Sequence, residues 1–237
     1  MSKERTALVL GASGGAGGAV ASKLREAGWT VKALRRVQDQ HSMIHEGTTW
    51  VRGDAMNAAD VARAARGVSV IVHAVNPPGY KRWDELVLPM IDNTIAAAVA
   101  EKATIVLPGT VYNFGADALP LVAEDALQRP STRKGAIRVE LERRIEAATR
   151  QDARALIVRA GDFFGPNSTS NWFAQGIVKA GSPVRKVSLL GDAGVGHQWA
   201  YLPDFALTVA KLLARRDTLE PFARFHFGGH WDADGTR

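Results

Sequence analysis

Apolar and polar positions along the chain alternate between two patterns, one typical of buried strands and one typical of helices. Short runs of Val, Ile, Leu and Ala are followed by longer segments in which apolar residues recur every three or four positions. The short runs predict strands at residues 7–11, 30–36, 48–54, 68–75, 103–109 and 154–161. The longer segments predict helices at residues 16–27, 57–67, 84–103, 133–150 and 203–216. Continuous apolar strands separated by helices indicate an α/β fold, with a doubly wound parallel sheet that is covered on both faces.

The regular alternation loosens after about residue 165. The stretch that follows, GPNSTSNWFAQGIVKAGSP, is rich in Gly, Ser and Asn, and a helix pattern returns only at PDFALTVAKLLARR. We therefore expect a sheet domain at 1–165 and a small C-terminal substrate lobe at 166–237. We find no internal repeat and no low-complexity linker.

Composition limits the kind of protein that this sequence encodes. Its 237 residues are 46% hydrophobic and 23% charged, as in an ordinary soluble domain. The absence of cysteine excludes disulfides, thiolate metal sites and cysteine nucleophiles, and it fits a reducing compartment. No apolar run reaches the length of a membrane span, and the N-terminus MSKERTALVL has no signal-peptide pattern. We therefore expect a cytoplasmic protein.

The chain carries a formal net charge of +6, which suits an anionic ligand. Its basic residues, however, are scattered and often stand beside acidic ones. Glu140 and Arg144, and likewise Glu146 and Arg150, are four positions apart, as on the solvated face of a helix. We therefore expect a small-molecule substrate, and neither nucleic acid nor a membrane as a partner.

A glycine-rich stretch, GASGGAGG, joins the first strand to the first helix. One interpretation is the Gly-x-Ser-x-Gly elbow of hydrolases, with Ser13 as the nucleophile. The other is a dinucleotide loop, in which Gly11, Gly14 and Gly17 let a pyrophosphate reach backbone amides at a helix N-terminus. The elbow normally follows several strands, whereas this stretch follows the first one, so its position favours the dinucleotide loop.

The end of the second strand bears on which dinucleotide is bound. NAD sites usually place an acidic residue there for the ribose 2′-hydroxyl, but this strand ends in Arg35 and Arg36. Two guanidinium groups suit a 2′-phosphate and predict NADP, with NAD as the second choice; ordinary surface arginines are the alternative. Asp54, at the end of the next strand, is a candidate for binding the adenine amine or for forming a turn.

With these features the chain resembles the short-chain dehydrogenase/reductase superfamily, in its extended and atypical branch of NAD-dependent epimerases/dehydratases, over nearly its whole length. The short matching pieces are GASGGAG at 11–17, GD at 53–54, VIVHAV at 70–75, DNT at 92–94 and VY at 111–112. Two longer blocks are more specific. RAGDFFGP at 159–166 is similar to the family's R-x-x-N-V-Y-G-P, and LGDAGVGHQWAYLPDFA at 190–206 is similar to its G-D-G…R-D-[FW]-[IV]-[HY]-V-x-D-[VL]-A.

The resemblance implies a Rossmann-like sheet and an NAD(P)-dependent oxidoreductase. Such an enzyme would transfer hydride at a carbonyl or alcohol carbon of a small, for example sugar-like, substrate. The expected cofactor-binding residues, from the loop and from the resemblance together, are Gly11, Ser13, Gly14, Gly15, Gly17, Arg35, Arg36, Asp54, Ala74, Val75, Asn76, Asp162 and Phe163.

The catalytic residues of the family are not matched here. Its Tyr-x-x-x-Lys pair, in which a tyrosinate moves the substrate proton beside a lysine, aligns with Lys134 and Arg138. Pro108 stands near the usual serine position, and Thr110 is the nearest hydroxyl. A lysine beside an arginine gives up its proton more readily, so Lys134 is the candidate general acid, with Tyr112 and Thr110 as rival donors. The alternative is an NADP(H)-binding sensor or regulatory protein that has no catalysis.

The substrate side is expected to be aromatic. The loop NPPGYKRW lies at the carboxyl end of the sheet and offers Tyr80 and Trp83. His197, Trp199 and Tyr201 alternate along HQWAY, so on a strand they share one face, which is either the pocket floor or aromatic core. The full set of expected substrate contacts is Tyr80, Trp83, Phe164, His197, Trp199 and Tyr201.

Three further expectations concern assembly, chain length and metals. The family's habit predicts a homodimer through the helix at 133–150. Family members usually continue past the strand resembled by FARFHFGG, so the C-terminal lobe is expected to be short. No third ligand is near the pair His41 and His45, and we therefore expect no metal site.

Overall fold

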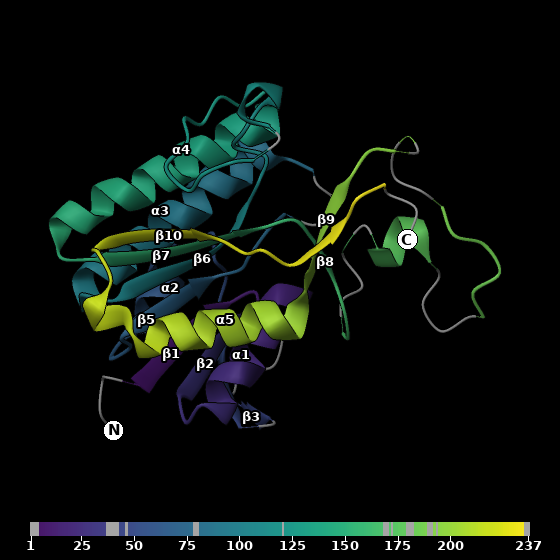
Figure 1. Cartoon of the computed structure of the whole chain (residues 1–237). Helices are drawn as coiled ribbons and strands as arrows, with labels where there is room; N and C mark the ends of the chain where they lie inside the picture. Colours follow the sequence, from purple (N-terminus) through teal and green to yellow (C-terminus); the bar gives the residue numbers. More distant parts are fainter. Residues whose placement is uncertain are drawn as a thin grey trace.

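The computed structural model describes residues 5–36, 43–45, 47–77, 81–119, 121–167, 171, 173–178, 183–188, 192 and 194–234. Its main sheet has eight strands in the order β10-β7-β6-β5-β1-β2-β4-β3 (Figure 1). Neighbouring strands are parallel except at one edge, where β3 runs antiparallel to β4. The strands are β1 (Thr6–Leu10), β2 (Thr30–Arg35), β3 (Met43–His45), β4 (Thr48–Arg52), β5 (Val70–His73), β6 (Thr104–Thr110), β7 (Arg154–Ala160) and β10 (Phe222–His226).

Helices cover both faces of this sheet. Figure 1 shows α3 and α4 on one side and α1 and α5 on the other. The helices are α1 (Gly15–Glu26), α2 (Ala58–Ala65), α3 (Trp83–Glu101), α4 (Arg133–Ala148) and α5 (Leu202–Ala214). Short helical turns are η3 (Ala116–Ala118), η4 (Thr149–Gln151), η5 (Phe173–Ile177) and η6 (Arg216–Thr218). Within the described residues, no helix has both the length and the apolar character that crossing a membrane requires.

The core consists of two apolar clusters, one on each face of the sheet. Successive side chains of a strand point to opposite faces, so Leu8 joins the cluster with α2, α3 and α4, whereas Val9 joins the cluster with α1 and α5. Ile71 and Val72 divide in the same way. Both faces of each central strand are therefore buried, which is why the sequence of these strands is apolar without alternation.

The predicted α/β fold with a doubly wound parallel sheet is confirmed. The predicted strands and helices are present, with most ends shifted by a few residues, as is usual where terminal turns fray. Asn57 caps the N-terminus of α2, since its Oδ1 accepts a hydrogen bond of 3.1 Å from the Asp60 amide. The apolar pattern did not predict the short strand β3 at the sheet edge.

The chain after residue 165 contributes to two sheets. Its helix α5 packs against α1, and its strand β10 pairs with β7 at the edge of the main sheet. A second sheet of three strands has the order β11-β9-β8, with β8 (Asp162–Phe164), β9 (His197–Tyr201) and β11 (His230–Asp232). In Figure 1 this small sheet lies beyond one end of the main sheet. The division of the chain into domains at residue 165 stays a prediction.

The strand order fixes where a ligand can enter. From β1 the chain crosses to β2 on one side, whereas β5 and β6 lie on the other side, so the direction of winding reverses between β1 and β5. The loops that leave these two strands diverge, and the crevice between them is the usual ligand site of open parallel sheets.

Candidate functional site

A cavity of about 960 Å³ lies at the carboxyl ends of the parallel strands. It is lined by the residues that follow β1, β2, β4, β5, β6 and β7, together with parts of α3, α4 and the segment before β9. It therefore occupies the crevice between β1 and β5 and extends from there toward the small sheet.

The glycine turn after β1 forms one wall of the cavity and is closely packed against the end of β5. Gly11 has φ +88°, and a Cβ on it would lie 2.5 Å from the carbonyl oxygen of Ala74. A Cβ on Gly17 would lie 2.3 Å from the carbonyl oxygen of Gly11. Side chains are therefore excluded at both positions, and the backbone at the start of α1 is left bare.

The N-terminus of α1 faces this bare turn. The Gly14 amide donates to the Gly11 carbonyl at 3.0 Å, which tightens the turn. No side chain caps α1, and its first turn contains no acidic residue. The partial positive charge of the helix N-terminus is therefore not neutralised by the chain, an arrangement that suits a phosphate. Ser13, Gly14 and Gly15 line the cavity here.

Two arginines line the cavity at the end of β2. The Arg35 guanidinium lies 4.8 Å from the centre of the Trp50 ring, so the two groups stack, and Arg36 follows it at the strand end. Asp54 also lines this part of the cavity, and its Oδ1 accepts a hydrogen bond of 3.0 Å from the Met56 amide. Asp54 thus forms a turn, which is one of the two roles that the sequence suggested for it, the other being to bind the adenine amine.

The opposite part of the cavity is lined by Ala74, Val75 and Asn76 after β5. Arg138 reaches them from α4: its Nη2 donates to Asn76 Oδ1 at 3.1 Å, and its guanidinium lies 4.8 Å from the centre of the Trp83 ring. Arg138 is 8% exposed and lines the cavity, as Trp83 does. A buried positive charge is therefore held beside the end of β5.

The candidate proton donors are placed differently from one another. Thr110 and Tyr112 line the cavity after β6, and Thr110 Oγ1 accepts a hydrogen bond of 3.1 Å from the Tyr112 amide. Lys134 Nζ lies 5.3 Å from the centre of the Trp83 ring, but Lys134 is not among the described residues that line the cavity. Of the three candidates, Thr110 and Tyr112 are therefore the two that line the cavity.

His73 is the last residue of β5 and lies near Arg138. The sequence did not indicate it as a candidate site residue. It is 2% exposed, and its Nδ1 is 2.8 Å from Thr94 Oγ1. Burial and, to a smaller extent, the Arg138 charge lower the pKa of His73 to about 3. His73 is therefore neutral at physiological pH. Its position within an apolar strand is typical of a core residue, and the sequence gives no other signal for it.

We expect His73 to make the stability of the chain depend on pH. Because its pKa is about 3 when folded and 6.5 in the unfolded chain, the unfolded state binds more protons between these values. As the pH is lowered below 6.5, the free energy of unfolding should therefore decrease, by about 2 kcal/mol between pH 7 and pH 5. In His73→Asn this contribution should vanish. Urea unfolding of both proteins at pH 5, 6 and 7 measures the difference, and parallel curves would contradict the assignment.

An acidic residue and a histidine face each other where the cavity meets the small sheet. Asp162 Oδ2 lies 2.9 Å from His197 Nε2, with side-chain exposures of 27% and 33%. Burial raises the pKa of Asp162, and the nearby His197 opposes that shift. Both residues line the cavity, as does Phe163, which follows Asp162 in β8. The sequence suggested each residue for a separate role but did not indicate that the two would meet.

The other expected substrate contacts form an aromatic cluster in the small sheet. The rings of Trp199 and Phe173 have centres 5.9 Å apart, and those of Tyr201 and Phe164 have centres 5.2 Å apart. Of the described residues expected to contact substrate, Trp83 and His197 line the cavity, whereas Phe164, Trp199 and Tyr201 do not. Tyr80 lies outside the described residues, as does His41. No metal-binding group of three His, Asp or Glu side chains occurs in the described part of the chain.

Comparison with known proteins identifies relatives of the whole chain. The model of the NAD dependent epimerase/dehydratase family matches residues 7–228. A search of curated proteins found no match. The family match covers the glycine turn, the end of β5 and both longer sequence blocks, so it favours the dinucleotide interpretation of the turn over the hydrolase elbow.

Several solved structures share the fold. One is MoeE5 in complex with UDP-glucose and NAD, with 22% identity, a TM-score of 0.75, and coverage of 97% of this chain and 78% of that chain. Another is a DesIV double mutant, a dTDP-glucose 4,6-dehydratase from Streptomyces venezuelae with NAD bound, with 18% identity, a TM-score of 0.74 and coverage of 96% and 77%. A third is UDP-glucose 4-epimerase from Brucella ovis with NAD, with 12% identity, a TM-score of 0.74 and coverage of 97% and 79%. At these identities the likeness shows the fold.

Proposed function

The chain belongs to the NAD-dependent epimerase/dehydratase family, and from this premise we propose that it is an NAD(P)-dependent oxidoreductase. The reaction is hydride transfer at a carbonyl or alcohol carbon of a small, sugar-like substrate. The observation that carries the proposal is the bare glycine turn at the N-terminus of α1, which lines a cavity of about 960 Å³ at the carboxyl ends of the strands. The three solved structures named above contain NAD, and one of them also contains UDP-glucose.

The residues around the cavity fit a dinucleotide. The amides at the start of α1 would hold the pyrophosphate, since no side chain caps them. Arg35 and Arg36 would lie at the adenosine end, and Asn76 and Arg138 at the nicotinamide end. Bound NAD(P) supplies or accepts the hydride, and the chain then has to orient the substrate and move a proton.

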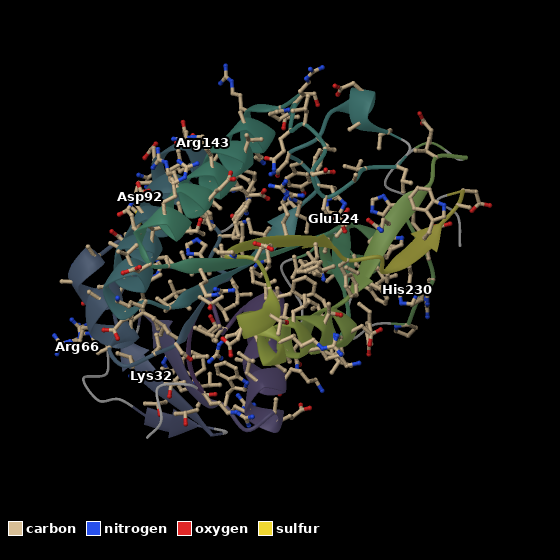
Figure 2. All side chains as sticks on the ribbon, turned by 60° about the vertical axis from the view of Figure 1, so that its left-hand side comes forward. Lys32, Arg66, Asp92, Glu124, Arg143 and His230 are labelled. Atoms are coloured by element: carbon tan, nitrogen blue, oxygen red, sulfur yellow. The ribbon has the colours of Figure 1, made fainter. Side chains whose placement is uncertain are left out.

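Within this proposal we assign a preference for NADP(H) to Arg35 and Arg36. Replacing both by alanine should weaken NADPH binding at least about tenfold more than NADH binding, because two guanidinium groups no longer face the 2′-phosphate. Fluorescence titration with each reduced dinucleotide measures the two affinities. The variant Arg66→Ala/Arg150→Ala removes the same charge from exposed positions and should leave both affinities unchanged; Figure 2 shows Arg66 at the outer edge of the molecule. An equal loss for NADPH and NADH in the first variant would refute the preference.

One observation favours a second candidate function, an NADP(H)-binding sensor without catalysis. The position aligned with the family's catalytic tyrosine holds Lys134, which does not line the cavity in the described structure. A chain that kept the nucleotide site and lost proton transfer would bind NADPH and never oxidise it.

The two functions are separated by one measurement. The purified chain is incubated with NADPH and, in turn, with a panel of simple aldehydes, keto-sugars, UDP-glucose and UDP-galactose. For the two nucleotide sugars the incubation is repeated with NADP⁺ and with NAD⁺. Absorbance at 340 nm follows net oxidation or formation of the reduced cofactor, and fluorescence follows binding. Chromatography of the sugars follows a conversion that returns the cofactor to its starting state. Turnover with any member of the panel supports the oxidoreductase. Tight binding with no turnover on the whole panel supports the sensor.

A further inference from the structure

We propose that His197 and Asp162 are the proton-transfer pair of this site, with His197 as the catalytic residue and Asp162 as its positioning residue. This proposal rests on the proposed oxidoreductase function. It gives both residues a part in proton transfer, whereas the sequence indicated Asp162 only as a cofactor-binding residue and His197 only as a substrate contact. It starts from a juxtaposition that only the fold creates. Asp162 begins β8 and is paired with Trp199 of the parallel strand β9. His197 stands two positions before Trp199, on the same face of β9, and its side chain lies 2.9 Å from Asp162 on the wall of the cavity.

The surroundings of the pair hold it in place. The His197 ring centre lies 4.4 Å from that of Trp199, two residues further along β9. Phe163, next to Asp162, has its ring centre 5.0 Å from that of the buried Phe205 in α5. The Trp199 ring thus restricts the His197 rotamer, and the contact between Phe163 and Phe205 holds the start of β8. Such restriction is what a group that must meet a substrate atom requires.

The hydrogen bond determines which ring nitrogen is available. When His197 is neutral, Nε2–H donates to the Asp162 carboxylate, and Nδ1 carries the lone pair. When His197 is protonated, the same carboxylate faces the imidazolium and stabilises its charge. Nδ1 is then the atom that gives a proton to a ligand in the cavity, or takes one from it. This division of roles between an imidazole and a carboxylate is a general device for acid–base chemistry near neutral pH.

The other ionisable groups that line the cavity are less suited to exchange a proton near neutral pH. Among the described residues these groups are Arg35, Arg36, Asp54, His73, Tyr112 and Arg138. The arginines keep their protons, and burial keeps His73 neutral against Thr94. Asp54 forms a turn at the adenosine end. Tyr112 is the remaining rival, and it is tested below.

The sequence departs from the family's blocks at these two positions together. Asp162 stands where R-x-x-N-V-Y-G-P has asparagine, and His197 stands where R-D-[FW] has arginine. Neither an asparagine nor an arginine side chain acts as a general acid or base at neutral pH, whereas an imidazole does, and a carboxylate can hold that imidazole in position. At positions 134 and 138, which align with the family's Tyr-x-x-x-Lys pair, the chain has Lys and Arg, and the imidazole–carboxylate pair lies elsewhere, on the cavity wall.

The proton balance of the step is simple. In reduction, the carbonyl carbon accepts a hydride, and the electron pair of the C=O π bond moves to the oxygen. The Nδ1–H bond of the His197 imidazolium breaks, and an O–H bond forms on the substrate. His197 is left neutral, with Nε2–H still donating to Asp162. In oxidation, neutral His197 takes the hydroxyl proton on Nδ1 while the carbon loses its hydride.

The test compares His197→Gln, Asp162→Ala and Tyr112→Phe, with His230→Gln as the matched control. His230 is an exposed histidine on the neighbouring strand β11, does not line the cavity, and is labelled in Figure 2. The substrate is whichever member of the panel the unaltered chain turns over. With it, kcat should fall about a hundredfold or more in His197→Gln and about tenfold or more in Asp162→Ala. The dissociation constant for NADPH should stay within about threefold, and the control His230→Gln should keep most of kcat. Tyr112→Phe tests the rival assignment of the proton donor.

A second readout does not depend on activity. In ¹⁵N NMR spectra of the unaltered chain, the His197 ring should show the tautomer with its proton on Nε2. In Asp162→Ala the fraction of His197 with its proton on Nε2 should decrease, because the carboxylate that accepts the Nε2–H hydrogen bond has been removed. Unchanged His197 signals in that variant, or a His197→Gln protein with normal kcat, would overturn the pair while leaving the oxidoreductase function in place. A loss of kcat in Tyr112→Phe alone would assign the proton to Tyr112. NADPH binding without turnover on the whole panel would overturn both proposals.

Discussion

Replacing Gly17 with alanine is expected to lower the affinity of the chain for NADPH and for NADH about a hundredfold, which corresponds to about 2.8 kcal/mol. The new Cβ would lie 2.3 Å from the Gly11 carbonyl oxygen and 3.1 Å from Ala74 Cβ. The first neighbour is backbone of the turn, and the second follows β5, against which the turn packs, so the turn or the start of α1 has to move. A shift of this kind displaces the amides that would bind the pyrophosphate.

The measurement is a fluorescence titration of Gly17→Ala with both reduced dinucleotides, together with thermal unfolding. Overpacking of this kind also lowers the free energy of unfolding by about 1–3 kcal/mol, so the titration is made well below the unfolding midpoint. Gly228→Ala is the matched control, because a Cβ on Gly228 meets no atom within 4 Å. It should bind and unfold as the unaltered chain does. Normal binding by Gly17→Ala would show that the turn does not hold the cofactor.

The same turn explains why part of the cavity lining could be predicted from the sequence. The glycines, the apolar strand before them and the helix after them are contiguous, so their local pattern already contains the geometry. The ends of β2 and β5 follow for a related reason: the carboxyl ends of parallel strands meet at one edge of the sheet. The positions of Arg35 and Asn76 at two such strand ends are therefore enough to predict that both face one cavity, as they do.

The contact between Asp162 and His197 could not be predicted in this way. Asp162 and His197 are 35 positions apart, and their contact depends on the pairing of two short strands that carry no strong apolar alternation. His73 lies in an apolar strand, and nothing local distinguishes it from core. Lys134 was favoured because it aligns with the family's catalytic tyrosine, but alignment along α4 does not determine whether a side chain reaches the cavity. Contacts between distant segments are set by packing, which a local pattern does not contain.

A second large effect is expected at Arg159, the arginine of the block that contains Asp162. Its side chain is fully buried, and its Nη2 donates to Glu142 Oε2 in α4 at 2.8 Å. Its Nη1 donates to the Glu124 carbonyl at 3.0 Å and lies 3.0 Å from His226 Nε2 in β10. One guanidinium therefore ties together β7, α4, β10 and the loop that contains Glu124. Figure 2 shows Glu124 near the end of the main sheet that faces the small sheet.

Arg159→Met should lower the free energy of unfolding by about 3–5 kcal/mol, because the Glu142 carboxylate is left buried without its cation. Urea unfolding followed by circular dichroism measures the loss. Arg143→Met serves as the control for an ion pair: Arg143 donates to Glu140 at 2.6 Å, but its side chain is 65% exposed, so no measurable loss is expected. In Figure 2 Arg143 lies on the outer face of α4, far from Glu124.

The double variant Arg159→Met/Glu142→Leu separates two explanations of that loss. If the cost comes from an unpaired buried charge, replacing both partners by apolar residues of similar size removes the charge, and at least half of the lost stability should return. If the cost instead comes from the other contacts of Arg159, with Glu124 and His226, the double variant should be as unstable as Arg159→Met or less stable. The first result would mean that the ion pair is replaceable by packing. The second would mean that Arg159 stabilises the fold chiefly by joining β10 and the Glu124 loop to the sheet edge beside Asp162.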